Sequence, residues 1–145
     1  LFNNARPNLT PFPEVELVLD RLRRSHRLAL VTDGPLERQR RKLESLGLVN
    51  YFEVILATGI WGSAFYKPHP RSFTTALTRL GCEPHDAIFV GDDPLIDIAG
   101  AAAIGLSTAL FAPEGLTLGN LPAAPDLVFA KFWDLVDFCE DRLRA

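Results

Sequence analysis

Three acidic side chains follow one apolar run in the second half of the chain. Residues 87–90 are apolar, Gly91 breaks the run, and Asp92, Asp93 and Asp97 come next. A short apolar run ended by glycine and polar residues predicts a buried strand and its end. Asp97 lies one helical turn beyond the pair, so its carboxylate can return to the same place. The spacing therefore predicts three carboxylates at one edge of a sheet.

Carboxylates gathered at one point favour a bound cation. Mutual repulsion would be relieved by a hard divalent ion such as Mg²⁺, which takes carboxylate and water ligands. Asp93 followed by Pro94 also fits a plain strand-to-helix turn, with Asp93 as the cap and the proline in the first helical position. Capping explains Asp93 but leaves Asp92 and Asp97 unexplained. The pattern favours a Mg²⁺ site made from Asp92, Asp97 and Asp93, and both interpretations can hold together.

Two other expected strands end in groups that suit a phosphoryl group. Residues 28–31 lead to Thr32 and the backbone amides of Asp33 and Gly34, and a hydroxyl with free N–H groups binds anions. Lys67 follows the strand at 54–57 and a loop, and the prolines after it stiffen the backbone. Each signal alone is weak, since strand-to-helix turns favour Thr, Asp and Gly. Together with the acids, they predict a site for a doubly charged phosphoryl group.

The elements that must position these residues alternate along the chain. Helices are expected at 13–22, 36–46, 70–80, 95–104 and 131–143, and strands at 28–31, 54–57, 87–90, 106–111 and 127–129. Loops are expected at 1–12, 58–67 and 112–125. Alternating strands and helices predict an α/β fold with a parallel sheet and right-handed crossovers, whose ligands bind at the carboxyl ends of the strands.

Composition narrows the class of protein. The chain has 145 residues, 48% hydrophobic and 23% charged, which predicts a single globular domain. A net charge of -3 gives no electrostatic case for nucleic acid or an anionic membrane as the partner. Its apolar runs have the length of strands, so no transmembrane helix is expected. Cys82 and Cys139 are expected to be free thiols, and the start does not resemble a signal peptide, which together predict a cytoplasmic location.

Three segments resemble motifs of one family. Residues 31–34, 67–70 and 91–94, the last with Asp97, resemble the second, third and fourth motifs of haloacid dehalogenase (HAD) superfamily hydrolases, in the same order. The resemblance covers nearly the whole chain and implies the family's Rossmann-like, three-layer fold with a mostly parallel sheet. It implies that Thr32 binds the transferring phosphoryl group and that Lys67 neutralises charge beside it. It also implies that Asp92 ligates Mg²⁺, supported by Asp97 and helped by Asp93.

One motif of the family is missing. The family begins with a strand ending in Asp-x-Asp, whose first aspartate is the nucleophile and whose second is the general acid/base. Here Asp20 is the only aspartate before Asp33, and Val31 stands two residues before Asp33. The chain also lacks methionine and opens on Leu1. It is therefore expected to be the C-terminal part of a longer protein, a single HAD-like core domain without the nucleophile strand and most of the cap. The absent central strand would leave a hydrophobic slot.

Two functions remain open at this point. The first is a Mg²⁺-dependent phosphatase that acts on a small phosphorylated metabolite through an aspartyl-phosphate, with the nucleophile supplied by the missing N-terminal segment or an oligomer partner. The alternative is a catalytically inactive HAD-like binding or regulatory protein. A dehalogenase would have little use for Asp92 and Asp97 together. A receiver-type signalling domain carries its acid pair first and its lysine last, the opposite order. Alone, the chain is expected to be inactive.

Overall fold

Strands and helices alternate along the chain as the sequence predicts. The computed structural model describes residues 13–115, 121 and 123–143. The strands are β1 (Ala29–Thr32), β2 (Val54–Ala57), β3 (Ile88–Gly91), β4 (Ser107–Phe111) and β5 (Leu127–Phe129). The α-helices are α1 (Pro13–Leu22), α2 (Leu36–Ser45), α3 (Pro70–Leu80), α4 (Gly100–Ala103) and α5 (Phe132–Leu143). Short helical turns η1 (Val49–Tyr51), η2 (Thr58–Ile60), η3 (Ser63–Phe65), η4 (Pro84–Asp86) and η5 (Pro94–Ala99) complete the elements. The expected loop over 1–12 lies outside the described residues, as does part of the one over 112–125.

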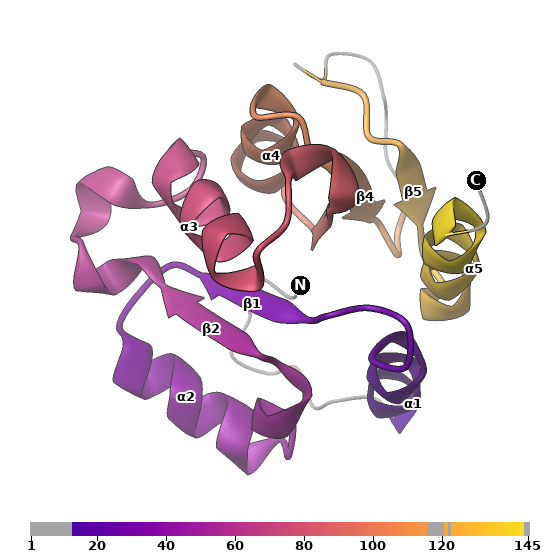
Figure 1. Ribbon diagram of the computed structural model, residues 1–145, viewed down its shortest axis with the longest axis horizontal. Helices are drawn as coiled ribbons and strands as arrows, with labels where there is room; N and C mark the ends of the chain where they lie inside the picture. The colour runs from indigo at the N-terminus through magenta and orange to yellow at the C-terminus, as the bar shows by residue number, and fades with distance from the viewer. Residues whose placement is uncertain (1–12, 116–120, 122, 144–145) are drawn as a thin grey trace.

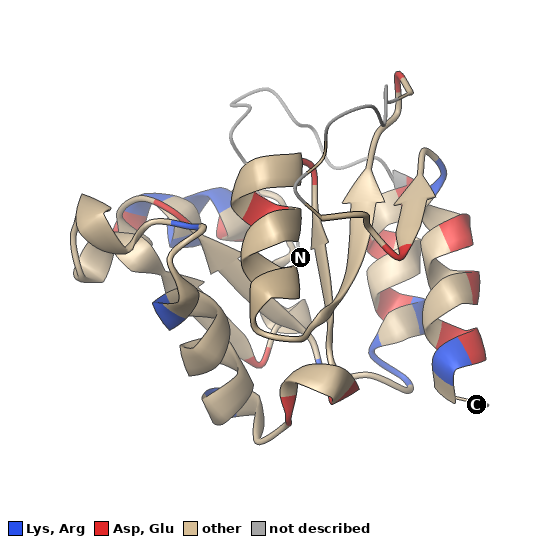
Figure 2. Cartoon of the chain, turned by 90° about the horizontal axis from the view of Figure 1, so that it is seen from above, with Lys and Arg blue, Asp and Glu red and all other residues tan. Residues whose placement is uncertain are grey.

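The strands form two parallel sheets. β1 pairs with β2, and β3, β4 and β5 pair in that order. Figure 1 shows β1 and β2 side by side in one half of the molecule and β4 and β5 in the other. Charged residues lie on helices and loops and leave the strands uncoloured in Figure 2. Strands without charges suit a sheet that is covered on both faces.

Two hydrophobic cores show that helices cover both faces. Leu30 of β1 and Val90 of β3 belong to one core, with residues of α1 and α5. Val31 and Phe89, their neighbours in sequence, belong to the other core, with residues of α3 and α4. Successive side chains of a strand point to opposite faces. The molecule therefore has three layers, with the strands in the middle. No helix in the described part is both long enough and apolar enough to cross a membrane.

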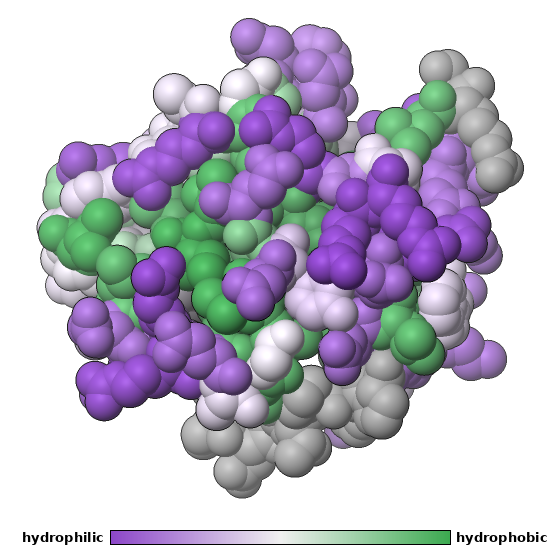
Figure 3. All heavy atoms as spheres, turned by 60° about the horizontal axis from the view of Figure 1, so that its bottom comes forward, coloured by the Kyte–Doolittle hydropathy of each residue, from purple (hydrophilic) through white to green (hydrophobic). Residues whose placement is uncertain are grey.

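A cavity separates the two sheets. Among the described residues β1 pairs only with β2 and β3 only with β4. A cavity of about 720 Å³ is lined by residues of both β1 and β3 and by parts of α1, α3 and α5. We call it the intersheet slot; its lining includes Leu22, Ala29, Val31, Phe89, Val90 and Cys139. Figure 3 shows apolar surface lying open in the middle of one face, bordered by hydrophilic side chains.

The expected helix over 95–104 is the main local difference. The chain instead forms a π-helical turn, η5, followed by the single α-helical turn α4. The backbone N–H of Ile98 donates to the carbonyl of Asp93 at 3.2 Å, which is the π spacing. The Asp97 side chain packs closely against Gly91: a Cβ added to Gly91 would lie 2.4 Å from the Cβ of Asp97. The inward position of Asp97 thus accompanies the wider turn. Other element ends differ from expectation by about one residue, as is usual at termini.

Candidate active site

One chain of hydrogen bonds joins the ends of β1 and β3 with the loop after β2. The Nζ of Lys67 donates to Asp97 Oδ1 at 2.7 Å. Asp97 Oδ2 accepts from the backbone N–H groups of Asp92 at 3.2 Å and Asp93 at 3.1 Å. At its other end, Lys67 donates its own backbone N–H to Asp33 Oδ1 at 3.1 Å. The structure therefore brings together the three segments that the sequence singles out.

The Lys67–Asp97 ion pair is fully enclosed. Both side chains have a relative exposure of 0%. A buried pair is tolerated when further hydrogen bonds satisfy its remaining donors and acceptors. Asp97 meets this condition because it accepts from three donors. Its two oxygens are thus engaged inside the protein, and Asp92 and Asp93 are left as the acids nearer the surface of the turn.

Asp93 and Asp92 have different environments. Asp93 Oδ1 accepts from the backbone N–H groups of Leu95 and Ile96, each at 2.9 Å, so Asp93 caps η5. Partial loss of water around Asp92 raises the pKa of its carboxyl, and the nearby charge of Asp97 raises that pKa further. A cation beside Asp92 would offset both effects. Asp92 is therefore a fitting ligand for Mg²⁺, whose preferred donors are oxygens.

A metal at Asp92 would need further ligands. Within the described ranges, no group of three or more His, Cys, Asp or Glu side chains is placed to hold a metal ion. Asp97 is committed to Lys67 and the turn, and one oxygen of Asp93 is committed to the cap. Water or residues beyond the described part would have to complete the coordination.

The end of β1 is held against the end of β2. Thr32 is buried, and its hydroxyl donates to the carbonyl of Asp33 at 3.3 Å. Asp33 Oδ1 also accepts from the hydroxyl of Thr58 at 2.7 Å. The backbone N–H of Gly59 donates to the carbonyl of Gly34 at 2.8 Å. Thr58 is the site residue that sequence reasoning missed, although its place directly after β2 matches that of polar residues after the other strands.

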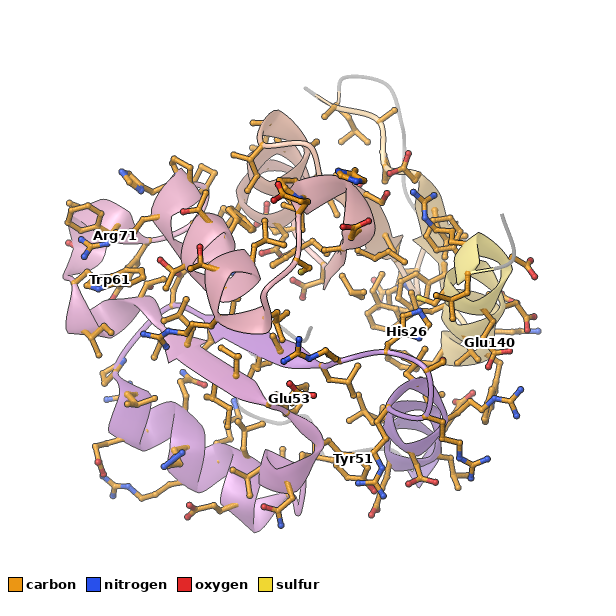
Figure 4. The ribbon with its side chains drawn as sticks, in the orientation of Figure 1. His26, Tyr51, Glu53, Trp61, Arg71 and Glu140 are labelled. Atoms are coloured by element: carbon orange, nitrogen blue, oxygen red, sulfur yellow. The ribbon has the colours of Figure 1, made fainter. Side chains whose placement is uncertain are left out.

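The loop over residues 58–67 carries three aromatic residues, Trp61, Phe65 and Tyr66. The guanidinium of Arg71 lies 4.2 Å from the ring centroid of Trp61 and 4.7 Å from that of Phe65. Figure 4 shows Arg71 and Trp61 together at one end of the molecule. His69 accepts from the backbone N–H of Arg71 through Nδ1 at 3.1 Å, so it caps α3. The ring of Phe65 lies 6.4 Å from that of Trp61 and 4.9 Å from that of His69, measured between centroids, so this aromatic surface packs within the loop and against the start of α3.

The intersheet slot and the hydrogen bonds that join Asp33, Lys67 and Asp97 lie in different parts of the molecule. The intersheet slot is lined by the strands themselves and by helix residues, and its lining does not include Thr32, Lys67 or Asp92. The chemically useful groups lie instead at the carboxyl edge of the strands, where the Lys67 ammonium is held beside the carboxylate of Asp97 and near that of Asp92. The arrangement can bind and polarise an oxyanion such as a phosphoryl group.

Comparison with known proteins identifies the family. Residues 3–105 match the haloacid dehalogenase-like hydrolase family, and the chain belongs to it. A phosphoserine phosphatase of Thermus thermophilus is 39% identical over 127 residues, which cover 87% of this chain and 50% of that protein. A glyceraldehyde 3-phosphate phosphatase of Methanothermobacter thermautotrophicus is 34% identical over 107 residues, or 73% of this chain and 46% of that protein. The chain thus spans about half the length of these relatives.

Solved structures show the same fold. A HAD phosphatase from Thermococcus onnurineus superposes with a TM-score of 0.78 at 30% identity, covering 88% of this chain and 57% of that one. A 2-haloacid dehalogenase from Pseudomonas syringae gives the same TM-score and identity, covering 91% of this chain and 54% of that one. The fold is therefore the α/β fold of the HAD-like hydrolases. The two sequence relatives named above are phosphatases, and the two solved structures are a phosphatase and a dehalogenase.

Proposed function

We propose that this chain forms most of the core domain of a Mg²⁺-dependent phosphatase that hydrolyses phosphate esters of small metabolites in the cytoplasm. The observation that carries the proposal is the hydrogen-bonded chain from Asp33 through Lys67 to Asp97, with Thr32 at one end and Asp92 at the other. The two sequence relatives reported above are phosphatases, which supports this choice over the dehalogenase activity named for one of the solved structures. The free thiols of Cys82 and Cys139 fit a reducing compartment.

Each residue would have a distinct role. The Thr32 hydroxyl and the backbone amides of Asp33 and Gly34 would bind the phosphoryl oxygens. The ammonium of Lys67 would neutralise charge that develops on them. Asp92 would hold Mg²⁺, whose chemistry is to polarise a phosphoryl oxygen. Asp97 would keep Lys67 and the turn in place through its three hydrogen bonds.

The nucleophile would come from another segment of the protein. We propose that a strand ending in Asp-x-Asp occupies the intersheet slot and forms an aspartyl-phosphate during turnover. Two features support this placement: β1 and β3 each lack a described partner on the side of the slot, and the lining is largely apolar. Unpaired strand edges carry free N–H and C=O groups that a parallel strand can satisfy. Such a strand would join both sheets, and its carboxyl end would lie between Thr32 and Asp92.

Phosphate release tests the function. A longer protein that includes the preceding segment should release phosphate from small phosphate esters, and removal of Mg²⁺ by a chelator should abolish that release. Residues 1–145 alone should release none, because they contain no Asp-x-Asp. Mg²⁺-dependent turnover by the 145-residue chain would disprove the placement of the nucleophile. A longer protein that binds phosphate esters without hydrolysing them would instead support the alternative of an inactive binding protein.

A further inference from the structure

We propose that Asp33 and Thr58 form a positioning pair that fixes the backbone of Lys67, and with it the ammonium beside the phosphoryl site. This inference rests on the proposed function. A single carboxylate oxygen, Asp33 Oδ1, accepts both from the Thr58 hydroxyl at 2.7 Å and from the Lys67 backbone N–H at 3.1 Å. Counted over the whole residue, Thr58 has a relative exposure of 0% and Lys67 of 3%. These contacts therefore form an enclosed network of hydrogen bonds.

Lys67 needs such an anchor because it belongs to no regular element. It lies between η3, which ends at Phe65, and α3, which begins at Pro70. No helix or strand ladder fixes its backbone. One turn hydrogen bond spans it, from the backbone N–H of His69 to the carbonyl of Tyr66 at 3.0 Å, and Pro68 directly after it has no N–H to donate. The backbone N–H of Lys67 is still available as a donor, and Asp33 Oδ1 accepts from it.

Two carboxylates from different sheets hold the two ends of this lysine. Asp33 follows β1 of the two-stranded sheet and holds the backbone, whereas Asp97 follows β3 of the three-stranded sheet and holds the ammonium. Lys67 thus joins the carboxyl edges of both sheets. Its side chain can keep one position only if both anchors are rigid.

Thr58 makes the Asp33 anchor rigid. The Thr58 hydroxyl fixes the orientation of the carboxylate by a hydrogen bond to a charged group, which is stronger than a neutral one. The backbones of the two strand-end loops also touch. A Cβ added to Gly59 would lie 2.0 Å from the carbonyl oxygen of Gly34, so the approach requires glycine. Asp33 therefore positions Lys67, while its own carboxylate is directed into the protein.

Matched variants of Thr58 test the positioning role in the longer, active protein. Thr58→Val keeps the branched shape without the hydroxyl, and Thr58→Ser keeps the hydroxyl. With para-nitrophenyl phosphate as the probe, kcat should fall about tenfold or more in Thr58→Val, since small displacements of catalytic groups cost one to two orders of magnitude. In Thr58→Ser, kcat should stay within about threefold of wild type. Equal kcat values for all three proteins would overturn the inference.

Hydrogen exchange of the Lys67 amide gives a readout that does not depend on activity. Asp33→Ala should accelerate this exchange about tenfold or more, whereas Asp33→Asn, which retains an acceptor oxygen, should keep most of the protection. The amide of Leu56 in β2 should exchange at the wild-type rate in both variants. Unchanged exchange at Lys67 in Asp33→Ala, or equal acceleration at Leu56, would overturn the inference. An inactive longer protein would refute the proposed phosphatase, and the exchange data would still decide whether Asp33 anchors Lys67.

Discussion

The buried Lys67–Asp97 pair makes an asymmetric prediction for stability. Asp97→Ala removes the acceptor of three hydrogen bonds and leaves an ammonium with 0% side-chain exposure without its ion-pair partner. Removing one partner of a buried pair costs about 3–5 kcal/mol. The two backbone N–H groups that lose Asp97 Oδ2 add about 1–3 kcal/mol each if they stay unpaired. We therefore expect Asp97→Ala to lower the free energy of unfolding by about 5 kcal/mol or more.

Lys67→Met should be milder. The Asp97 carboxylate then loses the ammonium but keeps two backbone donors, so we expect a loss near the lower limit, about 3 kcal/mol. The double variant Asp97→Ala/Lys67→Met should be more stable than Asp97→Ala alone, because it buries no unpaired charge. Glu44→Ala, at an exposed position of α2, is the control and should change stability by less than about 0.5 kcal/mol.

Equilibrium urea unfolding, followed by tryptophan fluorescence, measures these differences. The experiment suits the 145-residue chain if it unfolds cooperatively, and otherwise the longer protein proposed above. Asp97→Ala and Lys67→Met with equal losses below about 1 kcal/mol would show that the pair is not held in an enclosed, low-dielectric environment. A double variant less stable than Asp97→Ala would contradict the charge argument in particular.

Three further predictions concern other parts of the molecule. Gly59→Ala should lower the free energy of unfolding by at least about 3 kcal/mol, because the added Cβ clashes with Gly34. Gly47 has φ +70° and open space around it, so Gly47→Ala should lower the free energy of unfolding by only about 1–2 kcal/mol. Urea unfolding measures both changes. Burial raises the pKa of Cys139 to about 11 from 9.0. The stabilisation that comes from keeping this thiol protonated should be complete below pH 9, and the free energy of unfolding should fall by roughly 2–3 kcal/mol as pH rises to 11. Cys139→Ala should lack that part of the pH dependence, and an unchanged slope would contradict the assignment. Asp92→Asn should raise the Mg²⁺ concentration for half-maximal phosphatase activity about tenfold or more, and an unaltered Mg²⁺ titration would remove Asp92 from the metal site.

The sequence predicts the layered fold and the meeting of its polar strand ends for clear physical reasons. Apolar runs bounded by glycine and polar residues mark the strands, and parallel strands bring their carboxyl ends to one edge. Asp33, Lys67 and Asp97 follow such runs, so their meeting at one edge could be anticipated. The buried Lys67–Asp97 ion pair could not be predicted, because the spacing of residues in a sequence does not specify which acid a lysine reaches.

Other features depend on tertiary contacts that leave no local pattern. The π turn η5 accompanies the inward position of Asp97 under Gly91, whereas the residues from 95 to 104 read locally as an ordinary helix. Thr58 acts through Asp33, which lies in a different loop, and that approach depends on the backbone contact at Gly59. Such pairings become visible only when the distances between loops are known.

The intersheet slot has a consequence for how the chain behaves as a separate piece. Among the described residues β1 and β3 both border this slot, and under the placement proposed above the strand that joins them would belong to a separate segment. A peptide carrying that strand could therefore complete the sheet when added in trans, by the same backbone pairing that adds strands to open sheet edges in other complexes. The edges of β1 and β3 that lack a partner in the described part make association between isolated copies the competing outcome.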